Sequence, residues 1–261
     1  MTRRDLEGRG AVVTGAGRGI GAAVARALAG AGARVVVAAR TEREIEGTAA
    51  AIRDSGGEAW AVVCDATEEA SVKRLGEESR RRLGAVDILI ANAGASTSAP
   101  LAKITLAEWN GMLAANATSA FLAAREFFPE MASRGLGRIV MVASVVGLEG
   151  GRYVAHYSAA KHAVLGLVRS LAMEAAGTGV TVNALCPGYV ATDMTEQTLA
   201  NVQRRTGLPR EEALAAVLRT TGQKRLVTAE EVAAEAVALC LENAAGRNGE
   251  AIVIEGGARA S

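Results

Sequence analysis

The stretch "AVVTGAGRGIG", residues 11 to 21, decides the fold expected for this chain of 261 residues. An apolar, β-branched run passes at Thr14 directly into a glycine-rich turn, and "AAVARALAGAG" then continues with a helical composition. A continuous apolar run, rather than an alternating one, is typical of a strand that is buried on both faces of a parallel sheet. The stretch therefore predicts a strand, a tight turn and a helix.

Six further runs of this kind follow along the chain, separated by longer stretches of helical composition. They span residues 33–40, 59–65, 86–94, 137–144, 180–188 and 250–257. Seven parallel strands with helices on both faces make one doubly wound α/β domain, and the chain length suits a single domain. We therefore expect one domain over residues 1–261, with its chemistry at the carboxyl ends of the strands.

Composition excludes several classes of function. The net charge of +1 gives no electrostatic reason to bind nucleic acid or membrane. Three widely spaced cysteines and two histidines make a metal site or a disulfide framework improbable, so we expect no metal. No apolar run has the length of a signal peptide or a membrane span, and we expect a cytoplasmic protein.

The glycine-rich turn has the features of a phosphate-binding loop. Glycines let the backbone turn sharply and approach a pyrophosphate, which then meets the exposed N–H groups at the start of the next helix. The spacing differs from the GxGxxG fingerprint, and a plain tight turn is the alternative reading. The residues expected to contact the cofactor here are Gly15, Gly17, Arg18, Gly19, Ile20 and Gly21.

The end of the second strand distinguishes between two dinucleotides. NAD sites usually carry an acidic residue here for the ribose hydroxyls, whereas an arginine can meet the extra phosphate of NADP. The chain has Arg40 followed by Thr41, and Arg18 offers a second cation. Since guanidinium is a good donor to phosphate, we favour NADP(H) over NAD(H), the alternative being that Arg40 is a solvated residue at a helix start.

A tyrosine and a lysine lie four positions apart in "HYSAAKHAV", residues 156 to 164. At this spacing Tyr157 and Lys161 share one helical face, near enough for the ammonium to act on the phenol. The flanking His156 and His162 have no evident third ligand, so we expect them to be partner or surface groups rather than catalytic ones.

Several motifs, in this order and spacing, resemble the short-chain dehydrogenase/reductase family over nearly the whole chain. They are "TGAGRGIG" (14–21), "CDAT" (64–67), "ANAG" (91–94), "LAANAT" (113–118), "VMVASVVG" (140–147), "YSAAK" (157–161) and "CPGYVATDM" (186–194). The resemblance implies a Rossmann-like fold and hydride transfer between a nicotinamide and a carbonyl or secondary alcohol.

The resemblance also implies roles for four catalytic residues. Tyr157 donates the proton to the carbonyl oxygen, and the Lys161 ammonium, together with the positive nicotinamide of the cofactor, is expected to lower the pKa of the phenol from about 10. Ser144 donates a hydrogen bond to the oxygen on which charge develops. Asn116 helps to hold a water near the lysine.

Further residues match the family's cofactor contacts. Asp65 resembles the acid that binds the adenine amino group, the segment closing the fourth strand suits a ribose, and the "CPGYVAT" segment holds the nicotinamide carboxamide. Tyr157 and Lys161 count among the cofactor contacts as well. The other residues are Ala66, Asn92, Ala93, Gly94, Pro187, Gly188, Val190 and Thr192.

Residues 189–225 have no strand-like run and are expected to form a lid over the substrate. The arginines Arg204, Arg205 and Arg210 there either meet the phosphates of a coenzyme A or phosphopantetheine carrier or form a solvated face. Chain length and lid resemble the 3-oxoacyl thioester reductases and the 3-hydroxybutyrate dehydrogenase-like members. We therefore expect NADPH-dependent reduction of a 3-oxoacyl thioester.

Two alternatives remain open from the sequence. One is an NAD(P)-dependent dehydrogenase of another secondary alcohol, such as a hydroxy acid, a polyol or a cyclic hydroxyacyl thioester. The other is a non-catalytic dinucleotide sensor on the same fold. The resemblance further implies a homotetramer, formed through the helices that follow the fourth and fifth strands and through the C-terminal strand edge.

Overall fold

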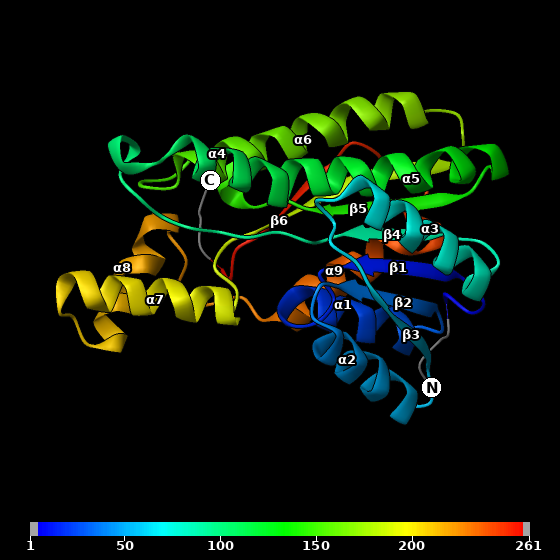
Figure 1. Cartoon of the computed structure of the whole chain (residues 1–261), viewed down its shortest axis with the longest axis horizontal. Helices are drawn as coiled ribbons and strands as arrows, with labels where there is room; N and C mark the ends of the chain where they lie inside the picture. The colour runs from blue at the N-terminus through cyan, green and yellow to red at the C-terminus, as the bar shows by residue number, and fades with distance from the viewer. Residues whose placement is uncertain (1–4, 258–261) are drawn as a thin grey trace.

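The computed structural model describes residues 5–257, and these form an α/β domain around one parallel sheet. The order of the strands is β3-β2-β1-β4-β5-β6-β7, and every neighbouring pair is parallel (Figure 1). All seven expected strands are confirmed, with ends that differ by a few residues. Their bounds are β1 Gly10–Thr14, β2 Arg34–Ala39, β3 Glu58–Val63, β4 Ile88–Ala91, β5 Gly137–Val142, β6 Val180–Pro187 and β7 Ala251–Ile254.

Helices cover both faces of the sheet (Figure 1). The helices α1, α2 and α9 pack on one face, and α3, α5 and α6 pack on the other. The bounds are α1 Gly19–Gly30, α2 Glu42–Asp54, α3 Glu69–Leu83, α4 Leu106–Leu113, α5 Ser119–Arg134, α6 Ala155–Ala175, α7 Asp193–Thr206, α8 Arg210–Thr221 and α9 Ala229–Cys240. Four short helical turns are η1 Leu101–Lys103, η2 Ala114–Thr118, η3 Val145–Gly147 and η4 Glu242–Ala244.

Two apolar cores, one on each face, explain why the strands read as continuous apolar runs. Along β1, Val12 faces the core beneath α3, α5 and α6, whereas Ala11 and Val13 face the core beneath α1 and α9. Since both sides of the strand are covered, alternate residues do not need to be polar. The three cysteines are buried and free, as the sequence indicated.

The arrangement of the strands positions a site at one edge of the sheet. After β3 the chain crosses to the other side of β1, so the connections leaving β1 and β4 diverge between two neighbouring strands. Such a switch point is where open α/β sheets bind ligands. The helices α7 and α8 project beyond the sheet and carry a small core of their own, formed by Leu199, Ala213 and Val217 (Figure 1). No helix within residues 5–257 is both long and apolar enough to cross a bilayer.

Candidate active site

The glycine-rich turn after β1 needs glycine for steric reasons. Gly15 has a φ of +64°, and a Cβ on it would lie 2.9 Å from the Cα of Ala93. A Cβ on Gly21 would lie 2.3 Å from the carbonyl oxygen of Gly15. Arg18, the N-cap of α1, makes no side-chain cap, so the helix start keeps N–H donors for an anion. The geometry fits a bound pyrophosphate.

Thr14 and Asn92 fasten this turn to the end of β4. The Thr14 hydroxyl accepts hydrogen bonds from the backbone N–H groups of Asn92 and Ala93, each at 3.1 Å. The Asn92 amide donates to the carbonyl oxygens of Thr14 and Gly15, at 2.9 and 3.1 Å. The Asn92 side chain therefore shapes the glycine turn, and the ribose contact expected for this segment stays a prediction. Thr14 itself was missed, although a threonine closing a strand before a glycine turn is a usable signal.

The ends of β2 and β3 bring Arg40 close to Asp65. Arg40 is exposed, and no hydrogen-bond or ion-pair partner is found for it among residues 5–257. Asp65 accepts two hydrogen bonds from Thr67, and these, with a smaller effect of the Arg40 charge, lower the pKa of Asp65. Thr41 is the N-cap of α2, and Ala66 is buried beside Asp65. Arg40 is thus an exposed guanidinium that makes no hydrogen bond or ion pair within the described residues, although its charge acts on Asp65.

Arg18 is less free than the sequence suggested. Its guanidinium lies 3.4 Å from a carboxylate oxygen of Glu44 and 3.9 Å from one of Asp193. A Cβ on Gly17 would also meet the Glu44 side chain. The two acids compete with a phosphate for Arg18, so Arg40 is the stronger candidate for the extra phosphate of NADP.

Ser144, Tyr157 and Lys161 come together where β5 meets α6. Ser144 directly follows the strand and is buried, and its hydroxyl interacts with the Tyr157 phenol. Lys161, also buried, donates a 2.7 Å hydrogen bond to the Val142 carbonyl and lies 5.7 Å from the centre of the Tyr157 ring. The η3 turn packs against α6 at Gly147, where a Cβ would lie 2.9 Å from the Lys161 carbonyl oxygen.

Asn116 lies in a π-helical turn, η2, between α4 and α5. Its buried amide donates to the carbonyl oxygens of Ala95 and Met112, at 2.9 and 3.0 Å. A Cβ on Gly94 would lie 2.7 Å from the Asn116 side-chain oxygen and 3.6 Å from the Lys161 ammonium nitrogen. Asn116, Gly94 and Lys161 therefore adjoin, and π-bulges of this kind are frequent at functional sites.

The segment that follows β6 passes next to the glycine turn. Pro187 ends the strand, Val190 is buried, and Thr192 is the N-cap of α7. A Cβ on Gly19 would lie 3.2 Å from the Thr192 methyl group. The expected nicotinamide segment and the expected phosphate turn thus face each other.

Comparison with known proteins agrees with this geometry. Residues 9–203 match the family described as short chain dehydrogenase. The chain belongs to the short-chain dehydrogenase family. It is therefore an NAD(P)-dependent oxidoreductase that acts on CH–OH groups.

Several family members are similar to this short-chain dehydrogenase over nearly their whole length. The 3-oxoacyl-[acyl-carrier-protein] reductase of Escherichia coli is 36% identical, covering 97% of this chain and 98% of the relative. A structure described as a "putative NAD(P) dependent gluconate 5-dehydrogenase" of Beutenbergia cavernae, with NADP bound at low occupancy, is 40% identical with a TM-score of 0.88, covering 97% and 98% of the two chains. An actinorhodin polyketide ketoreductase variant with NADPH is 35% identical with a TM-score of 0.91, covering 98% of each chain.

The lowering of the Tyr157 pKa by Lys161 together with the nicotinamide stays a prediction for this short-chain dehydrogenase, because the residues of the chain on their own shift this pKa upward. Burial raises the pKa of Tyr157 to about 12, with the nearby Tyr189 adding to the rise and the hydrogen bond with Ser144 opposing it. Burial also lowers the pKa of Lys161 to about 8. Loss of hydration is the largest cause of both pKa shifts. The Lys161 ammonium donates its hydrogen bond to the Val142 carbonyl.

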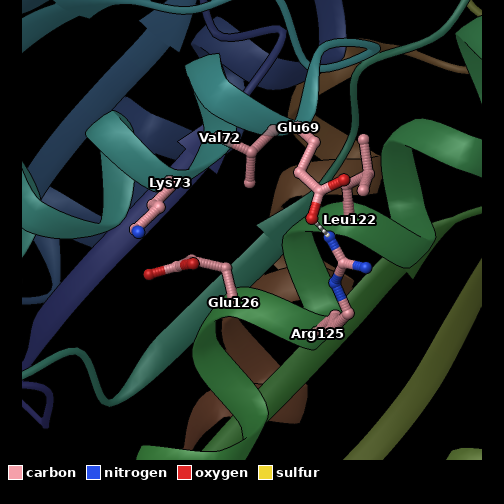
Figure 2. Close-up of a pocket in the computed structure, with 6 residues that line it drawn as sticks. All are labelled: Glu69, Val72, Lys73, Leu122, Arg125 and Glu126. Carbon is pink, nitrogen blue, oxygen red and sulfur yellow. Dashed lines mark hydrogen bonds and ion pairs between the residues drawn. The ribbon is translucent and has the colours of Figure 1, made fainter.

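The two histidines, the potential metal ligands and the hollow between α3 and α5 add no further group to the candidate site. His156 is buried and pairs with Thr97 at 2.8 Å, while His162 is exposed. No group of three or more potential metal ligands is found among residues 5–257. A hollow of about 180 Å³ between α3 and α5, crossed by the Glu69–Arg125 ion pair, contains none of the candidate residues (Figure 2).

Proposed function

We propose that this chain is an NADPH-dependent reductase of a 3-oxoacyl thioester, carried on acyl carrier protein or coenzyme A. The observation that carries the proposal is the grouping of Ser144, Tyr157 and Lys161 where β5 meets α6, with the Lys161 nitrogen 5.7 Å from the centre of the Tyr157 ring. A neutral phenol donates a proton to a carbonyl oxygen, whereas the reverse reaction needs a phenolate base. The 36% identical acyl-carrier-protein reductase and the polyketide ketoreductases support this substrate class.

Four residues of the chain have distinct roles in the proposed reaction. Ser144 and Tyr157 hold the substrate carbonyl oxygen, and Tyr157 delivers the proton to it. Lys161 orients the cofactor and attracts the developing charge, and Asn116 holds a water that links the lysine to solvent. NADPH, when bound, supplies the hydride.

Arg40 supports NADP(H) over NAD(H). It has a guanidinium without a partner among the described residues, at the strand end where a 2′-phosphate lies in dinucleotide sites. Bound NADP and NADPH in two similar structures support the same choice. Residues 189–225 form the lid in this proposal.

A second candidate function is favoured by the gluconate 5-dehydrogenase-like structure, which at 40% is more similar in sequence than the reductases cited above. A D-beta-hydroxybutyrate dehydrogenase of Rhizobium meliloti is also 34% identical. Under this alternative the chain oxidises a polyol or hydroxy acid. The choice depends on which substrates the lid admits.

The test is a panel of 3-oxoacyl thioesters, simple ketones, hydroxy acids and polyols, each assayed with NADPH and NADH. We expect the highest kcat/KM for a 3-oxoacyl thioester with NADPH, and a loss of kcat of at least about 100-fold for Tyr157→Phe. Faster oxidation of a polyol would favour the second function. Full turnover by Tyr157→Phe would remove Tyr157 from the mechanism.

We also propose a cytoplasmic homotetramer. The outer side of α5 exposes Phe121, on which Arg125 stacks at 5.1 Å, and α6 exposes Met173. Apolar side chains exposed on the helices that follow β4 and β5 support an interface there. The expected mass by light scattering is four chains, and a monomer would contradict the proposal.

A further inference from the structure

Gln223 is a buried amide whose hydrogen bonds link two segments far apart in the sequence. Its side-chain oxygen accepts from the Tyr189 backbone N–H at 2.7 Å and from the Thr221 hydroxyl at 2.9 Å. Its nitrogen donates to the carbonyl oxygens of Tyr189 and Arg225, each at 3.2 Å. Every strong hydrogen-bonding capacity of this amide is used, as a buried polar group requires.

The segments that Gln223 joins are the two ends of the lid. The chain enters α7 through residues 188–192 and leaves α8 through residues 222–227. Val190 and Val227 form a parallel bridge, and two backbone hydrogen bonds of 2.8 and 3.0 Å accompany it. A Cβ on Gly188 would lie 2.4 Å from the Gln223 oxygen, so only glycine leaves room for the amide.

Tyr189 connects the lid with the proton donor. Gln223 bonds to both the N–H and the carbonyl oxygen of the Tyr189 backbone. The Tyr189 side chain packs against the lid core of Leu199, Ala213 and Val217. The same side chain lies close enough to Tyr157 to act on its phenol electrostatically. A change in the Tyr189 backbone would therefore move both the lid and the surroundings of the catalytic tyrosine.

We propose that Gln223 is a positioning residue that fixes the nicotinamide-binding end of β6 and the stem of the lid. The inference rests on the proposed function, because the segment from Pro187 to Thr192 is taken to bind the nicotinamide. Gln223 acts through Gly188 and Tyr189 and does not itself touch the cofactor. It sets NADPH affinity and the KM of the ketone.

The test compares four variants with the wild-type chain. Gln223→Leu removes all four hydrogen bonds, and Gln223→Glu keeps the acceptor for the Tyr189 N–H but loses both donations. Thr221→Val removes one bond to the amide without touching Tyr189. Ile52→Val, in the buried face of α2, provides a loss of stability away from the lid. The Kd of NADPH is measured by fluorescence titration, the Tm by thermal unfolding, and KM and kcat with an active ketone from the panel.

We expect Gln223→Leu to raise the Kd of NADPH and the KM of the ketone by about tenfold, with Gln223→Glu intermediate. Thr221→Val and Ile52→Val should stay within about twofold of wild type in Kd, whatever their Tm. If the Gln223 variants lower only the Tm, the proposal is overturned, and if Gln223→Leu does not fold, an unchanged Kd for Gln223→Glu overturns it as well. Turnover of no ketone together with the expected Kd pattern would reject the proposed function and leave the role of Gln223 in place.

Discussion

The two halves of the candidate site are held in different ways. In the first half, which is the glycine turn after β1, close contacts among the backbone atoms of Gly15, Gly21 and Ala93 leave no room for side chains, and the Asn92 amide adds hydrogen bonds to the turn. In the second half, one side chain, that of Gln223, holds the end of β6. A backbone contact leaves a local glycine pattern in the sequence, whereas a long-range side-chain bond leaves none. The two halves should therefore respond differently to substitution.

The largest effect is expected from Gly21→Ala. The new Cβ would lie 2.3 Å from the Gly15 carbonyl oxygen and 2.4 Å from the Asn92 amide, so the turn must shift. We expect the NADPH Kd to rise about 100-fold, since overpacking of this kind typically costs up to ~3 kcal/mol. Gly30→Ala is the matched control on the same helix, because its Cβ would meet no atom within 4 Å. Equal NADPH binding by the two variants would show that the close contact does not shape the site.

The second-largest effect is expected from substitution of Arg40, which changes kcat/KM with NADPH. Arg40→Ala removes a guanidinium that has no partner among the described residues, so the loss should fall on the cofactor phosphate. We expect kcat/KM with NADPH to fall about 10- to 100-fold and that with NADH to change little. Arg43→Ala, an exposed arginine on α2, is the control. An equal fall with both cofactors would contradict the 2′-phosphate assignment.

Much of this first half could be predicted from the sequence, because its signals are local. The seven apolar runs gave the strands, and their carboxyl ends gave the positions of the glycine turn, Arg40, Asp65 and Ser144. The Tyr157 and Lys161 pair followed from the helical period. The hydrogen bonds from Asn92 to the turn could not be predicted in this way, since they join residues about 77 positions apart.

The second half, around the end of β6, was less predictable because its contacts join residues that are far apart in the sequence. Gln223 stands 34 positions from Tyr189, in a charged segment with no motif. The π-helical turn at Asn116 depends on how α4 and α5 pack, and not on local propensity. The raised pKa of Tyr157 depends on burial, which four-residue spacing does not report.

A smaller effect on kcat/KM is expected from a change of pH. The pKa of Lys161 is lowered to about 8, so the lysine loses its charge as pH rises through this value, while Tyr157, at about 12, stays protonated. Since kcat/KM reports groups of the free enzyme, kcat/KM for NADPH should fall several-fold above about pH 8. Lys161→Arg, whose guanidinium keeps its charge, should show a lower rate without this inflection up to about pH 10. An unchanged inflection in Lys161→Arg would assign the titration to another group.

The smallest effect is expected on the exposed surface of α7 and α8, the proposed lid. The sequence left open whether its arginines meet the phosphates of a carrier, and Arg210 instead pairs with Glu196 between α8 and α7. Arg204 bonds to Asn201 on its own helix. Because solvent screens exposed pairs, Arg210→Ala should change the KM of an acyl-coenzyme A substrate by less than about twofold. Glu196→Gln releases the guanidinium and serves as the control: a lower KM in this variant, or a rise above about fivefold in Arg210→Ala, would return Arg210 to the carrier's phosphates.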